Sequence, residues 1–323
     1  MIGDMRQVNA AMVLATLASA ALAAEAPVRV VPAPRKVHFE RGRFVIDERT
    51  AVLVSAQATR GTRVAARAVQ LGLRERFGLD LPIRRITDIP KRQPFKAIWV
   101  IEPRILRPPA NTIGVEGLHF TREMVYEGYF IRVDPIEVVL HGASDAGSFY
   151  AAWTFLQLVE PPRRATLFSK GRGPSVPCLW LEDWPQRRWR ALPAEIKVPP
   201  DPGEAARLLR LAARYRFNVL ARESLPPGLA RAGAVEQALA FYPIRFLDQA
   251  IKAPGPKDQP PPASAPHIEG RHPLARLARR AIAARDWELA LAALGEMAWG
   301  PPDPSPEDLV RTIRRLSPAG SKR

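Results

Sequence analysis

A hairpin followed directly by a helix that is apolar on nearly every side constrains the fold of this chain more than any other feature. Two apolar runs, Tyr129–Val133 and Glu137–His141, flank a turn at Asp134–Pro135 and predict antiparallel strands. Asp145 is a good N-cap for a helix over Gly147–Val159. A helix without a polar face has to be deeply buried. The unit therefore predicts a helix layer on a sheet, in an α+β domain.

The preceding residues supply the rest of this domain. A helix is expected over Thr62–Phe77, ended by Gly78, and a strand over Ala97–Ile101. Short runs rich in β-branched residues predict further strands at Val28–Val31, Lys36–Phe39, Arg43–Ile46 and Ala51–Val54. We expect a β-sheet with two helices over residues 27–175.

Residues 176–323 begin with a junction and then read as an incomplete α/β region. The junction holds Trp180, Trp184 and Trp189, which we expect to pack the two parts of the chain together. A helix over 203–216 and a strand over Phe217–Ala221, with the junction strand before them, give one strand–helix–strand step. A proline-rich linker at 253–266 and two helical segments follow.

The N-terminus has the pattern of a secretory signal peptide over residues 1–24. Arg6 precedes an apolar run that ends in small residues near Ala23, and translation could start at Met5. We expect a secreted or periplasmic protein with no membrane span. The single cysteine, Cys178, cannot form an intrachain disulfide and is expected to be buried.

The net charge of +16 has two interpretations. It indicates either an anionic partner or a compositional bias toward arginine. The basic residues are scattered, without the aromatic stripe that stacks bases, so no specific nucleic acid partner is expected. The five histidines lack metal spacing and no phosphate-binding loop is present, so neither a metal nor a cofactor is predicted.

Three motifs in order carry a family resemblance: "VRVVPAPRKVHFERGRFVIDERT", "EGYFIRV…VVLHGASDAGSFYAAWTFLQLV" and "VPCLWLEDWPQRRWRAL". Over about residues 28–192 the chain resembles glycoside hydrolase family 20, the exo-acting β-N-acetylhexosaminidases. The resemblance implies a zincin-like α+β domain before a (β/α)8 barrel. It also implies substrate-assisted hydrolysis, in which an adjacent Asp-Glu pair orients the acetamido group and supplies the acid.

That catalytic pair is not found in the sequence. The only Asp-Glu dipeptide, Asp47-Glu48, lies in an early turn, and Glu182-Asp183 has the reverse order. A barrel needs at least about 200 residues, whereas Gln186 to Arg323 is 138 residues. We therefore expect a truncated, TIM-barrel-derived remnant with no catalytic residues.

Arg190 is the one candidate substrate-binding residue. By resemblance it matches the family arginine that hydrogen-bonds sugar hydroxyls. The alternative is an ion pair within the junction, with Glu182 or Asp183.

Three functions remain open. The chain is a non-catalytic binding module for a glycan that contains N-acetylhexosamine, an active glycosidase with a rearranged site, or a basic envelope protein that binds anionic polymer. An active site would require convergence of carboxylates such as Glu195, Glu223, Asp248 and Glu296. Strand edges of an incomplete barrel would be covered by a partner or in a homo-oligomer.

Overall fold

The computed structural model describes residues 30–87, 96–101, 120–121, 123–162, 173–226, 243–246, 272–284, 286–299 and 306–316. The predicted signal peptide at 1–24 and the linker at 253–266 lie outside the described residues. Of the described helices, none is long and apolar enough to cross a membrane.

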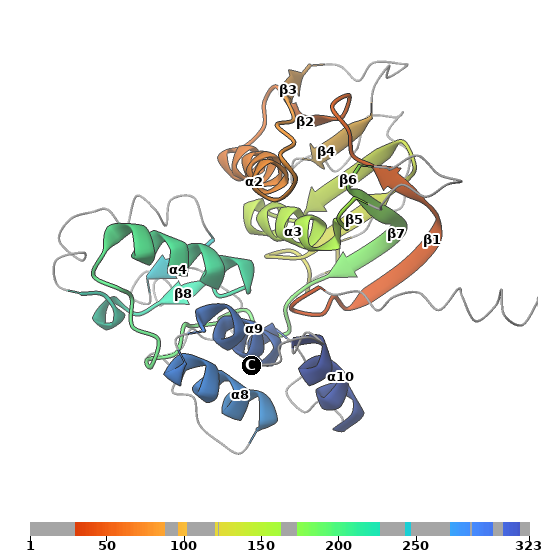
Figure 1. Cartoon of the computed structure of the whole chain (residues 1–323). Helices are drawn as coiled ribbons and strands as arrows, with labels where there is room; N and C mark the ends of the chain where they lie inside the picture. The colour runs from red at the N-terminus through yellow and green to blue at the C-terminus, as the bar shows by residue number, and fades with distance from the viewer. Residues whose placement is uncertain are drawn as a thin grey trace, which may run out of the picture.

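The largest unit is a seven-stranded mixed sheet with the order β1-β7-β5-β6-β4-β2-β3 (Figure 1). Neighbouring strands are parallel in the half β3-β2-β4-β6 and antiparallel in the half β6-β5-β7-β1. The strands are β1 (Lys36–Val45), β2 (Ala51–Ser55), β3 (Ile83–Ile86), β4 (Ala97–Ile101), β5 (Tyr129–Val133), β6 (Glu137–Gly142) and β7 (Ser175–Asp183).

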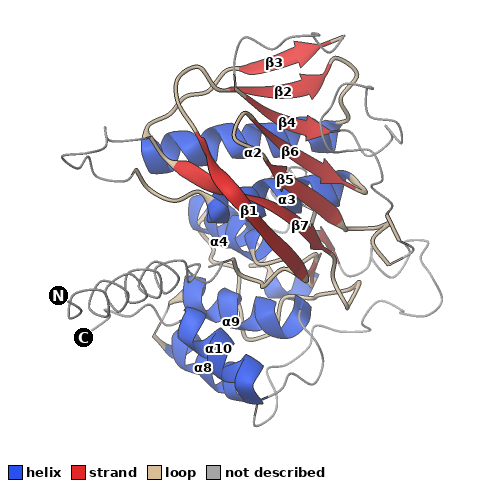
Figure 2. Cartoon of the chain, turned by 90° about the vertical axis from the view of Figure 1, so that its right-hand side faces the viewer, coloured by secondary structure: helices blue, strands red, loops and turns tan. Residues whose placement is uncertain are grey.

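Two helices, α2 (Arg60–Phe77) and α3 (Asp145–Leu158), cover one face of this sheet (Figure 2). Helix α2 ends at Gly78, whose φ of 71° lies in the left-handed region that glycine adopts without strain. The N-cap of helix α3 lies one residue earlier than expected: Ser144, not Asp145, accepts the Gly147 N–H, and the helix begins at Asp145 instead of Gly147. The predicted sheet with two helices is confirmed.

The core follows the alternation of side chains along the strands. Val52 and Ile98 face the helices, where α3 is buried on nearly all sides. Leu53, Trp99 and Val139 form a smaller apolar cluster on the other face. The predicted hairpin is confirmed, since β5 and β6 pair antiparallel.

The first strands differ from the prediction in one respect. Lys36–Phe39 and Arg43–Ile46 belong to one long strand, β1, whose register shifts between Phe39 and Arg43. Val30 and Val31 lie in no strand. Residues 176–183, assigned to the junction by sequence, form most of β7, which pairs with β1 on one side and β5 on the other.

The second part of the chain contains short parallel strand segments and helices (Figure 1). Its elements are α4 (Pro202–Arg214), β8 (Val219–Leu220), η1 (Arg222–Ser224), β9 (Arg245–Phe246), α8 (Pro273–Ala283), α9 (Trp287–Trp299) and α10 (Pro306–Leu316). Ala191 bridges Val219 in parallel, and β8 pairs in parallel with β9. The predicted helix is confirmed, and the strand expected over Phe217–Ala221 is shortened to β8. The strand expected before the helix is reduced to the single bridge of Ala191.

Candidate functional site

Arg190 lies just after the sheet, where the chain enters the second part, and its side chain has no exposed surface. Its Nε donates to the Arg216 carbonyl at 2.6 Å, and its Nη1 donates to the Arg187 and Arg188 carbonyls at 2.5 and 3.0 Å. Its Nη2 donates to Glu127 Oε2 at 2.5 Å. All three guanidinium nitrogens are therefore bonded within the protein.

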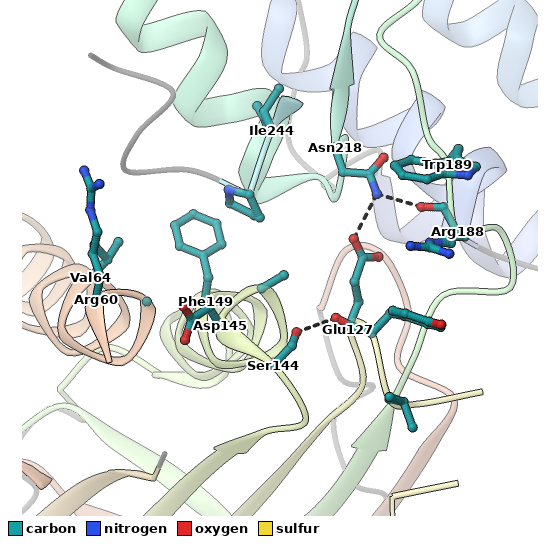
Figure 3. Close-up of a pocket in the computed structure, with 15 residues that line it drawn as sticks. Arg60, Val64, Glu127, Ser144, Asp145, Phe149, Arg188, Trp189, Asn218 and Ile244 are labelled. Carbon is teal, nitrogen blue, oxygen red and sulfur yellow. Dashed lines mark hydrogen bonds between the residues drawn. The ribbon is translucent and has the colours of Figure 1, made fainter. Parts of the chain in front are cut away.

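Glu127 and Asn218 complete this cluster (Figure 3). Asn218 Nδ2 donates to Glu127 Oε1 at 2.8 Å, while its Oδ1 accepts the Arg190 N–H at 2.8 Å. Burial acts to lower the pKa of Arg190, but the adjacent Glu127 carboxylate outweighs it and raises that pKa above its ordinary value. The predicted ion pair with Glu182 or Asp183 is corrected: the carboxylate is Glu127, and Glu182 binds Lys36 at 2.9 Å.

A second buried arginine, Arg216, continues the network into the sheet. Its Nη2 donates to the Tyr129 hydroxyl at 2.8 Å and to Thr154 Oγ1, and its Nη1 donates to the Tyr150 carbonyl at 3.1 Å. The Tyr129 hydroxyl in turn donates to Asp183 Oδ2 at 2.6 Å. Burial raises the pKa of Tyr129 well above its ordinary value, so the phenol stays protonated.

The two arginines and the carboxylates of Glu127 and Asp183 are all buried. Buried charges are tolerated only when they are paired and hydrogen-bonded. Here two positive and two negative groups balance. Glu127 precedes β5 and Asp183 ends β7, whereas Arg190 and Arg216 precede the parallel strand segments of the second part. The network therefore fixes the two parts of the chain against each other.

A cavity of about 490 Å³ lies beside this network (Figure 3). The second part contributes Arg188, Trp189, Asn218 and Ile244 to its wall. The α+β domain contributes Arg60, Val64, Tyr126, Glu127, Ser144, Asp145 and Phe149, among others. Aromatic and charged side chains thus share the lining.

The position of this cavity on the parallel strands limits what it can do. Its residues 188, 189, 218 and 244 directly precede the paired positions Ala191, Val219 and Arg245. The cavity therefore lies at the amino edge of these strands. Barrel enzymes carry their chemistry at the opposite, carboxyl edge, and the amino edge serves stability. The cavity does not correspond to a barrel active site.

Asp47-Glu48 forms a turn, as predicted. The Thr50 N–H donates to the Asp47 carbonyl at 2.9 Å, and Lys96 Nζ lies 2.9 Å from Asp47 Oδ2. Partial burial acts to raise the pKa of Asp47, but the hydrogen bond and charge of Lys96 hold it below its ordinary value. This carboxylate is engaged in fixing the turn.

The carboxylates named for a rearranged site occupy different surroundings. Glu296, in α9, is buried and accepts the Ala33 N–H at 3.1 Å, while Glu195 is exposed. The Glu223 side chain and Asp248 lie outside the described residues. Within the described ranges, no group of three or more His, Cys, Asp or Glu side chains could hold a metal ion.

The three tryptophans of the junction do not form one cluster. Trp180 and Trp184 lie on the sheet side, where Trp180 contacts Phe130 and Trp184 Nε1 donates to Glu123 at 3.1 Å. Trp189 packs on the small apolar cluster of the parallel strands. Cys178, in β7, is buried as expected.

Sequence reasoning missed Glu127, Asn218 and Arg216. The available signal was weak: Glu127 is a charged residue next to Gly128 and a strongly apolar strand, and Asn218 begins a short apolar run. Their shared role is revealed only by two contacts of Glu127, with Arg190 and with Asn218, which lie 63 and 91 residues away in the sequence.

Comparison with known proteins gives one family and a set of partial structural likenesses. Residues 27–184 match the family model "Glycosyl hydrolase family 20, domain 2". No curated protein matches the chain. The Streptomyces plicatus β-hexosaminidase in complex with N-acetylglucosamine is 22% identical, with a TM-score of 0.44, over 61% of this chain and 34% of that one.

Two further structures give similar values. The Vibrio harveyi exo-β-N-acetylglucosaminidase in complex with N-acetylglucosamine is 17% identical, with a TM-score of 0.41, over 60% of this chain and 25% of its own. The Flavobacterium johnsoniae chitobiase is 19% identical, with a TM-score of 0.41, over 60% of this chain and 26% of its own. The match thus spans about a quarter to a third of each of these structures. Over residues 27–184 the chain is thus similar to domain 2 of glycosyl hydrolase family 20, which supports an assignment to that family.

Proposed function

We propose that this chain is an exported, carbohydrate-associated member of family 20 that binds a glycan containing N-acetylhexosamine without hydrolysing it. One observation carries the non-catalytic part of the proposal, while the glycan class rests on the match of residues 27–184 to family 20. Arg190, which by resemblance would contact the sugar, has all three guanidinium nitrogens bonded inside the protein and is paired with Glu127. A guanidinium held in this way stabilises the junction between the two parts of the chain.

The architecture of the second part supports an origin from a barrel. Ala191, β8 and β9 are parallel, and α4 provides the connection between the first two, as in one step of a (β/α)8 fold. In this proposal the family 20 domain, with its zincin-like topology, closes the amino edge of a barrel remnant. The absence of an adjacent Asp-Glu pair after the junction in the sequence supports a non-catalytic role.

The first experiment measures turnover and sugar binding. The purified chain is incubated with p-nitrophenyl N-acetyl-β-D-glucosaminide, and binding of chitotetraose is measured by calorimetry. We expect binding without release of nitrophenol. Release that is lost when Glu195 or Asp248 is changed to the amide would overturn the proposal in favour of a rearranged active site.

The second experiment separates a structural role of Arg190 from a sugar contact. Arg190→Lys keeps the charge but loses the planar fork, so we expect lower stability and unchanged chitotetraose affinity of the folded protein. Arg187→Lys, at an exposed position, is the matched control. Loss of affinity at unchanged stability would assign Arg190 to the sugar instead.

Export and assembly are tested directly. N-terminal sequencing of protein recovered outside the cytoplasm should begin after Ala23 or Ala24. Recovery only in the cytoplasm, with the apolar run intact, would contradict export. Sedimentation of the purified chain tests whether a homo-oligomer covers the edges of the parallel strands.

A further inference from the structure

A groove lined by arginines runs between α2 and α3 on one side and α4 on the other. Its main hollow has a volume of about 530 Å³ and continues into a second hollow of about 240 Å³ through shared residues Gly72, Glu75, Trp153 and Arg210. The half-buried or buried lining is apolar and comprises Val64, Ala68, Leu71, Phe149 and Trp153. The arginines of the two hollows are Arg60, Arg63, Arg67, Arg76, Arg207, Arg210 and Arg214.

The charge along this groove is strongly unbalanced. Against seven arginines, Glu75 is the only carboxylate among the described residues that line it, and one of the seven, Arg214, pairs with Glu288 outside the lining at 3.4 Å. The hydrogen bonds recorded for Arg63 and Arg67 go to neutral oxygens, the Ala58 carbonyl and Gln70 Oε1. An anionic ligand would therefore gain charge-assisted hydrogen bonds without displacing a carboxylate from these two side chains.

Two of the arginines already disturb each other. Arg76 donates to the Leu156 and Val159 carbonyls at the end of α3. Burial first, and then the positive charge of Arg214, lowers the pKa of Arg76. Because Arg214 is itself paired with Glu288, its positive charge at this end of the groove is partly balanced, and Arg76 is the cation that an anion would stabilise.

The spacing of the arginines indicates a ligand with repeated charges. Arg60, Arg63 and Arg67 share one side of α2 over about 10 Å, since a helix rises about 1.5 Å per residue. Arg207, Arg210 and Arg214 have the same spacing on α4. A ligand with a single anionic group would contact the arginines at one end of such a groove. A chain with anions along its length would contact the arginines of both helices.

Trp153 indicates the chemistry of the uncharged part of the ligand. Its indole ring lines both hollows, and its Nε1 is buried without a hydrogen-bond acceptor among the described residues. The Arg214 guanidinium lies over the indole ring, 5.8 Å from its centre, so a pyranose ring would pack its C–H groups on the other face. A sugar hydroxyl can accept from the indole N–H. Both requirements fit a saccharide with acidic substituents.

We propose that this groove binds an acidic oligosaccharide that carries a carboxylate on alternating sugar rings. The rings lie along Trp153 and Leu71, and the carboxylates pair with arginines of α2 and α4 on either side. This site does not depend on the function proposed above, because it needs neither Arg190 nor any barrel residue beyond α4.

The test uses a hyaluronan octasaccharide as the probe, with binding measured by calorimetry at low and at physiological salt. The variant R63Q/R67Q removes two exposed arginines from the groove. The control R84Q/R85Q removes two exposed arginines from β3, so both variants have the same net charge. We expect R63Q/R67Q to weaken binding about tenfold, since each exposed charge-assisted contact contributes about threefold, and the control to leave it within about twofold.

Trp153→Phe gives an independent variant, because it keeps an aromatic side chain and removes the N–H donor together with the five-membered ring. We expect a further loss of about fivefold, which corresponds to one hydrogen bond. Equal weakening by R63Q/R67Q and R84Q/R85Q would overturn the proposal, since binding would then follow net charge alone. It would also fail if chitotetraose binds the groove as tightly as the acidic probe, or if an acidic amphipathic peptide binds there more tightly.

Discussion

The buried pair of Arg190 and Glu127 makes a quantitative prediction for Glu127→Gln. The substitution keeps the shape of the side chain but removes its charge, and its new NH2 group must face a donor. Both carboxylate oxygens accept hydrogen bonds now, one from Arg190 and one from Asn218. Removing one partner of a buried ion pair costs about 3–5 kcal/mol. Because one acceptor oxygen survives, we expect a loss near the lower end, about 3 kcal/mol.

The assay is denaturant unfolding at neutral pH, followed by tryptophan fluorescence, with calorimetry as a second measurement. For a chain of this size about 3 kcal/mol corresponds to a melting temperature about 6 °C lower. Glu123→Gln is the matched control, because Glu123 is exposed and its bond from Trp184 Nε1 can be retained. The control should stay within about 0.5 kcal/mol of the wild type.

Salt provides a further check on the same variant. An exposed pair is screened by salt, whereas a buried pair is screened much less. The loss caused by Glu127→Gln should therefore persist at high salt. If Glu127→Gln and Glu123→Gln have the same free energy of unfolding, the two parts of the chain are not held together by this pair, and the structural role of Arg190 is refuted.

Three further predictions concern the sheet and its helices. Tyr129→Phe removes the hydroxyl that donates to Asp183 and should lower the free energy of unfolding by about 2 kcal/mol; a change under about 0.5 kcal/mol in urea unfolding would contradict the network. Burial lowers the pKa of His141 to about 4 from 6.5, so stability should be full above pH 6.5 and fall as the pH drops toward 4, by about 3 kcal/mol in all. His141→Gln should remove most of that acid dependence in unfolding curves measured across this range, and an unchanged slope would contradict the assignment. Gly142→Ala places a Cβ 2.0 Å from the Ser148 backbone nitrogen, so thermal unfolding should show a loss of about 3 kcal/mol or more unless α3 can shift away.

The sequence predicted best those elements whose causes are local. The hairpin of β5 and β6 follows from a turn between two apolar runs, and the end of α2 follows from Gly78. Arg190 was singled out from a motif, but its partners are Glu127 and Asn218, which lie 63 and 28 residues away. No pattern within a short window relates these residues, because the contact exists only after the sheet and the parallel strands have packed.

The strand that contains residue 176 shows a second limit of sequence patterns. The run from Ser175 to Asp183 contains Pro177 and alternates poorly, and its pattern assigns residues from 176 on to the junction and not to the sheet. In the structure it is paired on both sides, by β1 and β5. Its place in the sheet comes from those two partners and from the burial of Val176, Leu179 and Leu181 among them.

The distribution of arginines is the case where the sequence misled most. Along the chain the basic residues look scattered, and neither α2 nor α4 alone has a purely basic face. The two helices are separated by about 140 residues, and packing brings their arginine sides to opposite walls of one groove. A net charge of +16 that arose only from composition would spread the basic residues evenly, yet the described residues that line the two hollows include seven arginines and one carboxylate, Glu75. The groove thus concentrates positive charge at one place on the molecule. An anion can then be bound at a defined position, instead of being attracted to the surface in general.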